Sequence, residues 1–261
     1  MQIQVPKRLI RDGYIRVTPT AWRGANGGDR YTLCIPVDLL DDPSTRILLR
    51  DEFDGPGYEA RERQLLDTLL SPNSLFLDIG AHWGIYCLHV LSAPLNVRVV
   101  AVEPDPTNLR HFRYNLAENG AMGRARVVAA AAAGTTGSLW LRQNTAMGHH
   151  VTANPERVDI AALEVETVTI DDLVRRFDAE DGDRGRPICI KIDIEGRERL
   201  ALEGAVNTLR SGRVAGVLWE ARVGGVANPD ALEIAAFLQQ HGLTTEEINP
   251  DYRLSTPSRS L

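Results

Sequence analysis

Three short segments of the chain carry acidic side chains at spacings that suit the binding of a small charged molecule. In the first, Asp78–Gly84 (DIGAHWG), a carboxylate precedes a turn with two glycines. Glycine lets the backbone approach a ligand closely, and the free amides of a following helix attract polar groups. A carboxylate here repels a pyrophosphate but binds an ammonium group, so the turn suits a nucleoside that carries an amino acid. The alternative is a turn that serves packing alone.

The second acidic position is Glu103, which follows a predicted strand and precedes Pro104. A carboxylate at the end of a strand beside the glycine turn can accept hydrogen bonds from both ribose hydroxyls of an adenosine. A helix-capping role for Glu103 is the alternative. Taken together, Asp78 and Glu103 fit S-adenosylmethionine (SAM), with Asp78 facing the methionine end and Glu103 facing the ribose.

The third segment is Lys191–Glu195 (KIDIE), in which charged residues alternate with isoleucines. Because side chains alternate across a strand, Lys191, Asp193 and Glu195 share one face. Buried charges must pair or meet a polar ligand, and open α/β sheets bind ligands at the carboxyl ends of their strands. We therefore predict that Asp193, tuned by Lys191, is a catalytic base or orients the substrate, with His82 and Glu195 as other candidate bases. The structural alternative is a Lys191–Asp193 ion pair, with Glu195 at a helix N-terminus.

Further motifs accompany these segments: GYE at 57–59, VEPDP at 102–106, ENG at 118–120, TIDDL at 169–173, KIDIEGRE at 191–198 and Glu220. Over about residues 58–221 they resemble the FkbM-type family of SAM-dependent methyltransferases, and KIDIEGRE is the most specific of them. The resemblance implies a three-layer αβα, Rossmann-like class I methyltransferase fold, whose seven-stranded sheet is mostly parallel with an antiparallel edge strand. It also implies SAM as the cofactor and O-methylation of a hydroxyl on a sugar, a polyketide or another secondary metabolite.

The resemblance and the local chemistry together assign roles to individual residues. The predicted SAM-binding residues are Glu59, Asp78, Gly80, Ala81, His82, Gly84, Glu103, Pro104, Ala130 and Ala131. The predicted catalytic residues are Lys191, Asp193 and Glu195, and the acceptor side is expected to include His149, His150 and Glu220. His82 stands where the family usually has Asn, and Ala129 where it usually has a polar residue, so backbone groups are expected to contact the adenine. A metal held by Asp193, Glu195 and Glu220 is the alternative to the metal-free site that we predict.

The elements that must position these residues alternate in the order of a parallel sheet covered by helices on both faces. Core strands are predicted at 75–79, 98–102, 126–133, 188–194 and 214–219, with further strands at 138–141 and 165–170. Helices are predicted at 85–91, at 106–119 with Asp105 as N-cap, at 171–177, at 196–210 and at 231–241 with Asp230 as N-cap. The stretch 142–160 is expected to be a long loop, 178–187 a turn with solvated charges, and the first sixty residues irregular or short strands.

Length and composition limit the classes of protein. The 261 residues, 43% of them hydrophobic, suffice for a methyltransferase domain at 58–261 and an N-terminal extension at 1–57, which we expect to cap the acceptor side. The 29 basic and 35 acidic residues give a net charge of −6 without a basic run, which argues against a nucleic-acid partner. No signal peptide or membrane span is visible, and three scattered cysteines indicate a reduced, cytoplasmic setting.

Two other functions are compatible with such a sheet. A nucleotide-dependent oxidoreductase is one, although the chain lacks a GxGxxG motif and has Asp78 at a strand end. A protein that binds SAM without catalysis is the other. The expected partner of the methyltransferase is a small hydroxylated acceptor, whose identity the sequence leaves open along with the oligomeric state, a homodimer included.

Overall fold

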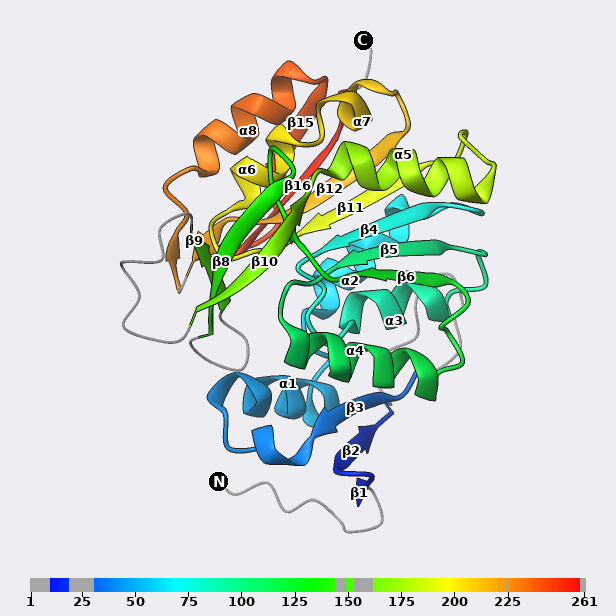
Figure 1. The fold of residues 1–261 in the computed structure, drawn as a ribbon, viewed down its shortest axis with the longest axis vertical. Coiled ribbons are helices and arrows are strands. Elements are labelled where there is room, and N and C mark those ends of the chain that lie inside the picture. Colours follow the sequence, from blue (N-terminus) through cyan, green and yellow to red (C-terminus); the bar gives the residue numbers. More distant parts are fainter. Residues whose placement is uncertain (1–9, 19–30, 144–148, 153–161, 224, 259–261) are drawn as a thin grey trace.

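The computed structural model describes residues 10–18, 31–143, 149–152, 162–223 and 225–258 (Figure 1). At its centre lies a seven-stranded sheet in the order β15-β16-β12-β11-β4-β5-β6. Its strands are β4 (Leu75–Ile79), β5 (Arg98–Val102), β6 (Ala125–Val128), β11 (Ile188–Ile192), β12 (Val214–Glu220), β15 (Leu243–Glu247) and β16 (Tyr252–Pro257). The mostly parallel sheet is confirmed. Its antiparallel strand, expected at the edge, is β16, which lies one position inward because β15 pairs with its outer side.

Helices cover both faces of this sheet because the strand residues alternate between two cores. On one face lie α2 (Ala60–Leu69), α3 (Ile85–Ser92) and α4 (Pro106–Glu118), which pack with Phe76, Val99 and Leu218. On the other face lie α5 (Ile170–Asp181), α6 (Glu198–Glu203), α7 (Val206–Arg210) and α8 (Ala231–Gln240), which pack with Leu77, Val100 and Ile190. The structure therefore has the three-layer αβα architecture that the sequence predicts.

Two helices begin at an aspartate followed by proline. The predicted cap at Asp105 is confirmed, since its side chain accepts hydrogen bonds from the amides of Thr107 and Asn108 at 2.7 and 2.9 Å. Asp42 caps α1 (Pro43–Asp54) in the same way. This twelve-residue helix corrects the expectation that the first sixty residues are irregular or short strands. Its capping signal is the same as that of α4, and proline at the first helical position costs no hydrogen bond in either case.

The N-terminal segment forms a three-stranded antiparallel sheet of β1 (Ile10–Arg11), β2 (Tyr14–Val17) and β3 (Leu33–Pro36). A short 3-10 helix, η2 (Val37–Leu39), connects β3 to α1. Hydrogen bonds dock this sheet onto α4, because Asn115 Oδ1 accepts from the amide of Cys34 at 2.7 Å. Asn119 exchanges two further bonds with the backbone of Thr32 at 2.8 and 2.7 Å. The extension is thus built onto the helix that follows β5.

The core strand predicted at 126–133 is wrong in its second half. The chain leaves the central sheet after Val128 and enters a four-stranded sheet in the order β7-β10-β8-β9. Its strands are β7 (Ala131–Ala132), β8 (Gly137–Gln143), β9 (His149–Thr152) and β10 (Ala162–Val168). Alanine has a weak strand preference, so the alanine run does not hold a long strand. The predicted loop at 142–160 contains β9 and the end of β8, while 144–148 and 153–161 lie outside the described residues.

Two helix predictions need correction. The helix predicted at 196–210 is divided into α6 and α7 at Gly204, where a Cβ would overlap the carbonyl oxygen of Ala133. Only glycine permits such a close backbone approach. The side chain of Asp230 makes no capping bond, and its amide donates instead to Asn228 Oδ1 at 2.9 Å. A small hairpin of β13 (Arg222–Val223) and β14 (Val226–Ala227) precedes α8.

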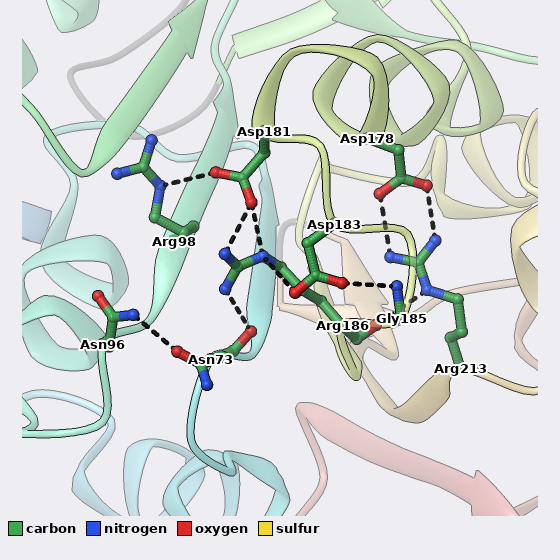
Figure 2. A network of polar contacts seen from close by, with 9 residues as sticks. All are labelled: Asn73, Asn96, Arg98, Asp178, Asp181, Asp183, Gly185, Arg186 and Arg213. Carbon is green, nitrogen blue, oxygen red and sulfur yellow. Dashed lines mark hydrogen bonds and ion pairs between the residues drawn. The ribbon is translucent and has the colours of Figure 1, made fainter.

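Paired arginines hold the amino end of the central sheet together (Figure 2). Arg213 binds both carboxylate oxygens of Asp178 at 2.7 and 3.1 Å. Arg186 contacts Asp181 at 2.7 Å and donates to the carbonyl oxygen of Asn73 at 2.8 Å. Asp178 and Asp181 belong to α5 and their side chains are only 12% and 13% exposed. The expectation of solvated charges at 178–187 is therefore wrong for these two, because arginines from neighbouring loops pair with them.

The three cysteines are free and buried in different elements, Cys34 in β3, Cys87 in α3 and Cys189 in β11. Cys34 packs as a small apolar side chain. The thiols of Cys87 and Cys189 donate to Asp78 Oδ2 and to the carbonyl oxygen of Leu69, at 3.0 and 3.3 Å. None of the helices in the described ranges is long and apolar enough to cross a membrane.

Candidate active site

A cavity of about 310 Å³ lies at the carboxyl ends of β4, β5, β11 and β12. Open parallel sheets bind their ligands at this end. The predicted site residues on its wall are Glu59, Gly80, Ala81, His82, Glu103, Pro104, Ala131, Lys191, Asp193, Glu195 and Glu220. The fold therefore brings all three segments singled out in the sequence to a single cavity.

The turn after β4 is shaped by two residues in the left-handed region. Gly80 has a φ of +87°, and a Cβ on it would overlap the carbonyl oxygen of Asp193, so only glycine fits where the turn meets the segment after β11. His82 has a φ of +50°, which is uncommon for a residue with a side chain. The amides of Gly80 and Ala81 both donate to the carbonyl oxygen of Val102, at 2.9 and 3.0 Å. These bonds fix the turn against β5 and present its outer backbone to the cavity.

Three of the predicted SAM-binding residues lie behind the cavity wall. Asp78 is buried beneath the turn, where the thiol of Cys87 donates to its Oδ2 at 3.0 Å and burial raises the pKa of Asp78. Gly84 begins α3, and a Cβ on it would overlap the ring of Phe112. Ala130 is buried between β6 and β7. These residues support the wall from behind, whereas Gly80, Ala81 and His82 form it.

Glu103 joins the glycine turn to the start of α4. Its Oε2 accepts from the amide of His82 at 2.9 Å, and its Oε1 accepts from the amide of Asp105 at 2.9 Å and from Asn108 at 3.3 Å. Burial raises the pKa of Glu103 to about 7, even though these hydrogen bonds favour the charged form. The residue lies on the cavity wall and organises the turn, and its contact with a ribose stays a prediction.

A charged cluster occupies the centre of the site. Lys191 Nζ donates to Asp193 Oδ2 at 2.9 Å and lies 4.5 Å from the centre of the Tyr86 ring. The hydroxyl of Tyr252 lies 2.8 Å from the same Asp193 oxygen and 3.0 Å from Glu59 Oε1. Burial lowers the pKa of Lys191, but the neighbouring carboxylates outweigh this and raise it above the ordinary value. Lys191 is therefore an ammonium group, and the ion pair weighed as a structural alternative is present within the cavity itself.

Glu220, at the end of β12, lies on the same wall. Burial, together with the charges of Asp193 and Glu195, raises the pKa of Glu220 to about 11, so its carboxyl group is protonated at neutral pH. Glu195 has a φ of +54°, in the left-handed region, as does Glu59 with +49°. Strained backbone of this kind is typical of binding and catalytic sites.

Several residues of the site were not found by sequence reasoning. Glu198 is buried beneath the segment after β11, where its Oε1 accepts from the amides of Ile194 and Gly196, both at 3.1 Å. An acidic residue in the first turn of a helix is the signal that could have found it. The tyrosines at 58, 86 and 252 also line the cavity, as do Ser44, Ile47 and Leu141. The types of the aromatic and aliphatic residues among them carry no signal, because such residues are the ordinary content of a core.

The predicted acceptor-side histidines are placed only by their backbone. β9 sets His149 and His150 opposite Gln143 and Arg142 of β8, and their side chains lie outside the described part of the structure. Their contact with an acceptor stays a prediction. Among the described residues, no group of three or more His, Cys, Asp and Glu side chains is arranged to hold a metal ion.

A mostly parallel seven-stranded sheet with a cavity at its carboxyl end and a glycine turn after β4 defines a Rossmann-like methyltransferase fold. The model of the methyltransferase FkbM domain matches residues 78–243, well over half of the chain. The protein therefore belongs to the methyltransferase FkbM domain family. This membership favours methyl transfer over the oxidoreductase alternative.

Solved structures resemble the chain at low sequence identity. Methyltransferase FkbM from Methylobacillus flagellatus KT has a TM-score of 0.51 and 19% identity, over 72% of this chain and 44% of that one. A precorrin-6y C5,15-methyltransferase from Geobacter metallireducens GS-15 has a TM-score of 0.44 and 16% identity, over 77% and 88% of the two chains. An rRNA methylase from Streptococcus thermophilus has a TM-score of 0.43 and 13% identity, over 75% and 94%. The present chain thus spans less than half of the Methylobacillus protein, whose likeness shows the fold. No curated protein is similar enough to this sequence to count as a relative.

Proposed function

We propose that the protein transfers the methyl group of SAM to a hydroxyl oxygen of a small molecule. The observation that carries this proposal is the ionised Lys191–Asp193 pair, which lines the same cavity as the glycine turn and Glu103. In this proposal, the site for the donor nucleoside adjoins a carboxylate able to hold an acceptor hydroxyl. The family membership supports the methyl-transfer half of this proposal.

The cavity fits SAM in its charge. Among the described residues of its wall, the acidic groups outnumber the single ammonium of Lys191, which suits a donor with a sulfonium and an ammonium group. We assign the donor to Glu59, Gly80, Ala81, His82, Glu103, Pro104 and Ala131, with Asp78, Gly84 and Ala130 in support.

The chain's own contribution is to orient the acceptor and take its proton. Bound SAM supplies a methyl carbon whose bond to sulfur breaks, leaving the electron pair on sulfur, as the acceptor oxygen bonds to that carbon. The hydrogen on that oxygen becomes strongly acidic as the new bond forms. Lys191 keeps the pKa of Asp193 low against the effect of burial. The Asp193 carboxylate can still receive the hydroxyl proton, because that proton is by then strongly acidic. Holding both reactants in line contributes up to ~7–11 kcal/mol in such reactions.

The N-terminal extension supplies part of the acceptor side in this proposal. Ser44 and Ile47 of α1 line the cavity. The Arg63 guanidinium of α2 lies 2.8 Å from the Glu52 carboxylate of α1, and both side chains are fully buried. This pair holds α1 in place beside the mouth of the site, so residues 1–57 act as the cap that selects the acceptor. A small hydroxylated metabolite in the cytoplasm, of the kind found in secondary metabolism, is the proposed substrate.

The experiment compares the wild-type protein with Asp193→Asn and with Asp183→Asn, an exposed aspartate near the amino end of the sheet. Methyl-labelled SAM is incubated with panels of sugars, polyols and polyketide alcohols, and SAM binding is measured by calorimetry. We expect D193N to bind SAM as the wild type does and to lose ~10²–10⁴-fold in turnover, the usual contribution of proton transfer. D183N should match the wild type in both measurements.

Three results would contradict this proposal. Full turnover by D193N removes Asp193 from the reaction, and labelling of amines but not of alcohols replaces O-methylation by N-methylation. Binding of SAM without transfer to any acceptor favours a non-catalytic SAM-binding protein. Thermal stabilisation by SAM and not by NAD is expected in every case, because a ligand at a hundred times its Kd adds ~2.7 kcal/mol.

A further inference from the structure

The hydroxyl of Tyr252 lies between two carboxyl groups that come from opposite parts of the chain. It lies 2.8 Å from Asp193 Oδ2, just after β11, and 3.0 Å from Glu59 Oε1, just before α2. All three groups face the cavity, and Tyr252 is itself buried in β16. Both distances are those of hydrogen bonds between oxygen atoms. The three side chains therefore form a continuous chain of contacts across the site.

A count of the available hydrogens indicates that one of the two carboxyl groups is protonated. A tyrosine hydroxyl has one hydrogen, and an ionised carboxylate has none. The hydroxyl can donate to one carboxylate only, so its second contact needs a hydrogen from the other carboxyl group. Asp193 Oδ2 already accepts from Lys191 Nζ at 2.9 Å, which identifies Asp193 as the ionised group. Glu59 is then the protonated one.

The surroundings of Glu59 favour the same assignment. The groups that face it are Tyr58 beside it in sequence, Tyr86 of α3, Lys191 and Asp193 of β11 and the segment after it, and Tyr252 of β16. Burial raises the pKa of Glu59 against the pull of Lys191. Burial also disfavours the charge on Asp193, but the Lys191 ammonium and the bonds from Glu220 and Tyr252 hold the pKa of Asp193 below its ordinary value.

We propose that Tyr252 and a protonated Glu59 position Asp193 for methyl transfer. The Glu59 carboxyl hydrogen is donated to the Tyr252 oxygen, and the Tyr252 hydrogen is donated to Asp193. Two donors, Tyr252 and Lys191, then converge on one oxygen of Asp193 and fix the carboxylate against rotation. Tyr252 acts through Asp193 and is a positioning residue. This role in the reaction rests on the proposed function, whereas the protonation of Glu59 does not.

Infrared spectroscopy of the ligand-free protein tests the protonation directly. The spectrum of the wild type minus that of Glu59→Gln, at neutral pH, should contain the carbonyl band of a protonated carboxyl group, and this band should shift in heavy water. A difference spectrum with ionised carboxylate bands alone overturns the proposal. If E59Q does not fold, Tyr252→Phe replaces it. The loss of the hydrogen-bond acceptor should then move the same carbonyl band, and an unmoved band overturns the proposal.

The pH dependence of methyl transfer tests the positioning role. Because the bond from Tyr252 lowers the pKa of Asp193, Y252F should move the acid limb of the kcat profile to higher pH. We expect kcat to fall by at least about tenfold, with the Kd for SAM unchanged. Tyr114→Phe is the matched control, since the hydroxyl of Tyr114 contacts only Asp12 at 3.4 Å among the described residues, far from the cavity.

A loss of stability in Y252F with no shift of the acid limb shows a merely structural tyrosine and overturns the positioning role. An absence of methyl transfer in every variant, the wild type included, is a failure of the proposed function. The infrared experiment remains decisive in that case, because it needs neither SAM nor an acceptor.

Discussion

Charged side chains gather at both ends of the parallel sheet, and their pairing differs between the two ends. At the amino end, Arg213 binds Asp178 through two bonds and Arg186 bridges Asp181 and a carbonyl group (Figure 2). Arg98, Arg186 and Arg213 each have an acidic partner there. At the carboxyl end, Lys191 is the one buried ammonium group among several carboxyl groups on the described part of the cavity wall.

This difference distinguishes a structural charge cluster from a binding site. A cluster in which arginines and carboxylates pair with each other needs no ligand to balance its charge. Such a cluster stabilises the loops that it connects. An acidic cluster with one cation keeps some of its carboxyl groups protonated, as Glu220 shows, until a cationic ligand arrives. The residue types at the two ends are similar, so the balance of charge carries the information about function.

The largest expected effect is a loss of stability on replacing a glycine at the carboxyl end of the sheet, compared with a glycine at the amino end. Gly80 and Gly212 both have a positive φ, +87° and +72°, but a Cβ at Gly80 would overlap the backbone of Asp193, whereas a Cβ at Gly212 meets no atom within 4 Å. We expect Gly80→Ala to cost ~2–5 kcal/mol, from ~1–2 for the left-handed backbone and ~1–3 for steric displacement. Gly212→Ala should show only the first of these costs.

Urea unfolding of both variants measures the difference, and calorimetry with SAM shows whether G80A still binds the donor. Equal losses of stability in the two variants would mean that the contact between the turn and the segment after β11 is not tight. The two ends of the sheet would then not differ in how tightly the backbone packs around these glycines.

The second effect concerns the pH dependence of stability. Because the pKa of Glu103 is about 7 in the folded protein against an ordinary 4.5, the folded state binds this proton more tightly than the unfolded state does. The contribution of Glu103 is therefore full below pH 4.5 and is lost as the pH rises to 7, a change of ~3 kcal/mol. Glu103→Gln cannot ionise and should flatten this part of the curve.

The measurement is the free energy of unfolding in urea at several pH values between 4 and 8. Glu203→Gln is the control, since Glu203 is exposed on α6, and its curve should keep the wild-type slope. A curve for E103Q that is parallel to the wild type would show that burial does not hold a proton on Glu103.

The smallest effect is expected at the amino end. Arg213→Ala removes two charge-assisted bonds to Asp178, which are partly shielded from water, and should cost ~1.5–3 kcal/mol of stability. The Kd for SAM and kcat should not change. In Arg175→Ala the lost partner is Asp172, on an exposed pair, and the cost should stay within ~0.2–1 kcal/mol. A fall in kcat for R213A, measured at a temperature where the variant is folded, would break the separation of roles between the two ends.

Local signals explain what could be predicted from the sequence. The strands that end at Ile79 and Val102 are short apolar runs, and the cap at Asp105 depends on its own neighbours alone. The carboxyl ends of parallel strands necessarily meet at one edge, so Glu103 and Asp193 could be placed in a common site without coordinates. The same reasoning places Glu220 there.

What could not be predicted depends on contacts between distant parts of the chain. The bond between Tyr252 and Glu59 joins residues separated by 193 positions, and a buried tyrosine in a short strand has no feature that distinguishes it from core packing. Gly204 divides a predicted helix because the backbone of Ala133 approaches it from another element. The exit of the chain from the sheet after Val128 likewise depends on pairing with β10, which follows much later.

The position of β16 also determines when the central sheet can be completed during synthesis. β15 is synthesised before β16, but it joins the sheet only through β16. In the sheet, β16 lies between β15 and β12. The two strands form a hairpin, and both follow β12 in the chain. Since Tyr252 belongs to that hairpin, the strand that links β15 to the sheet also carries the contact with Asp193. A growing chain on the ribosome that has not reached residue 252 has neither a finished sheet nor a finished site.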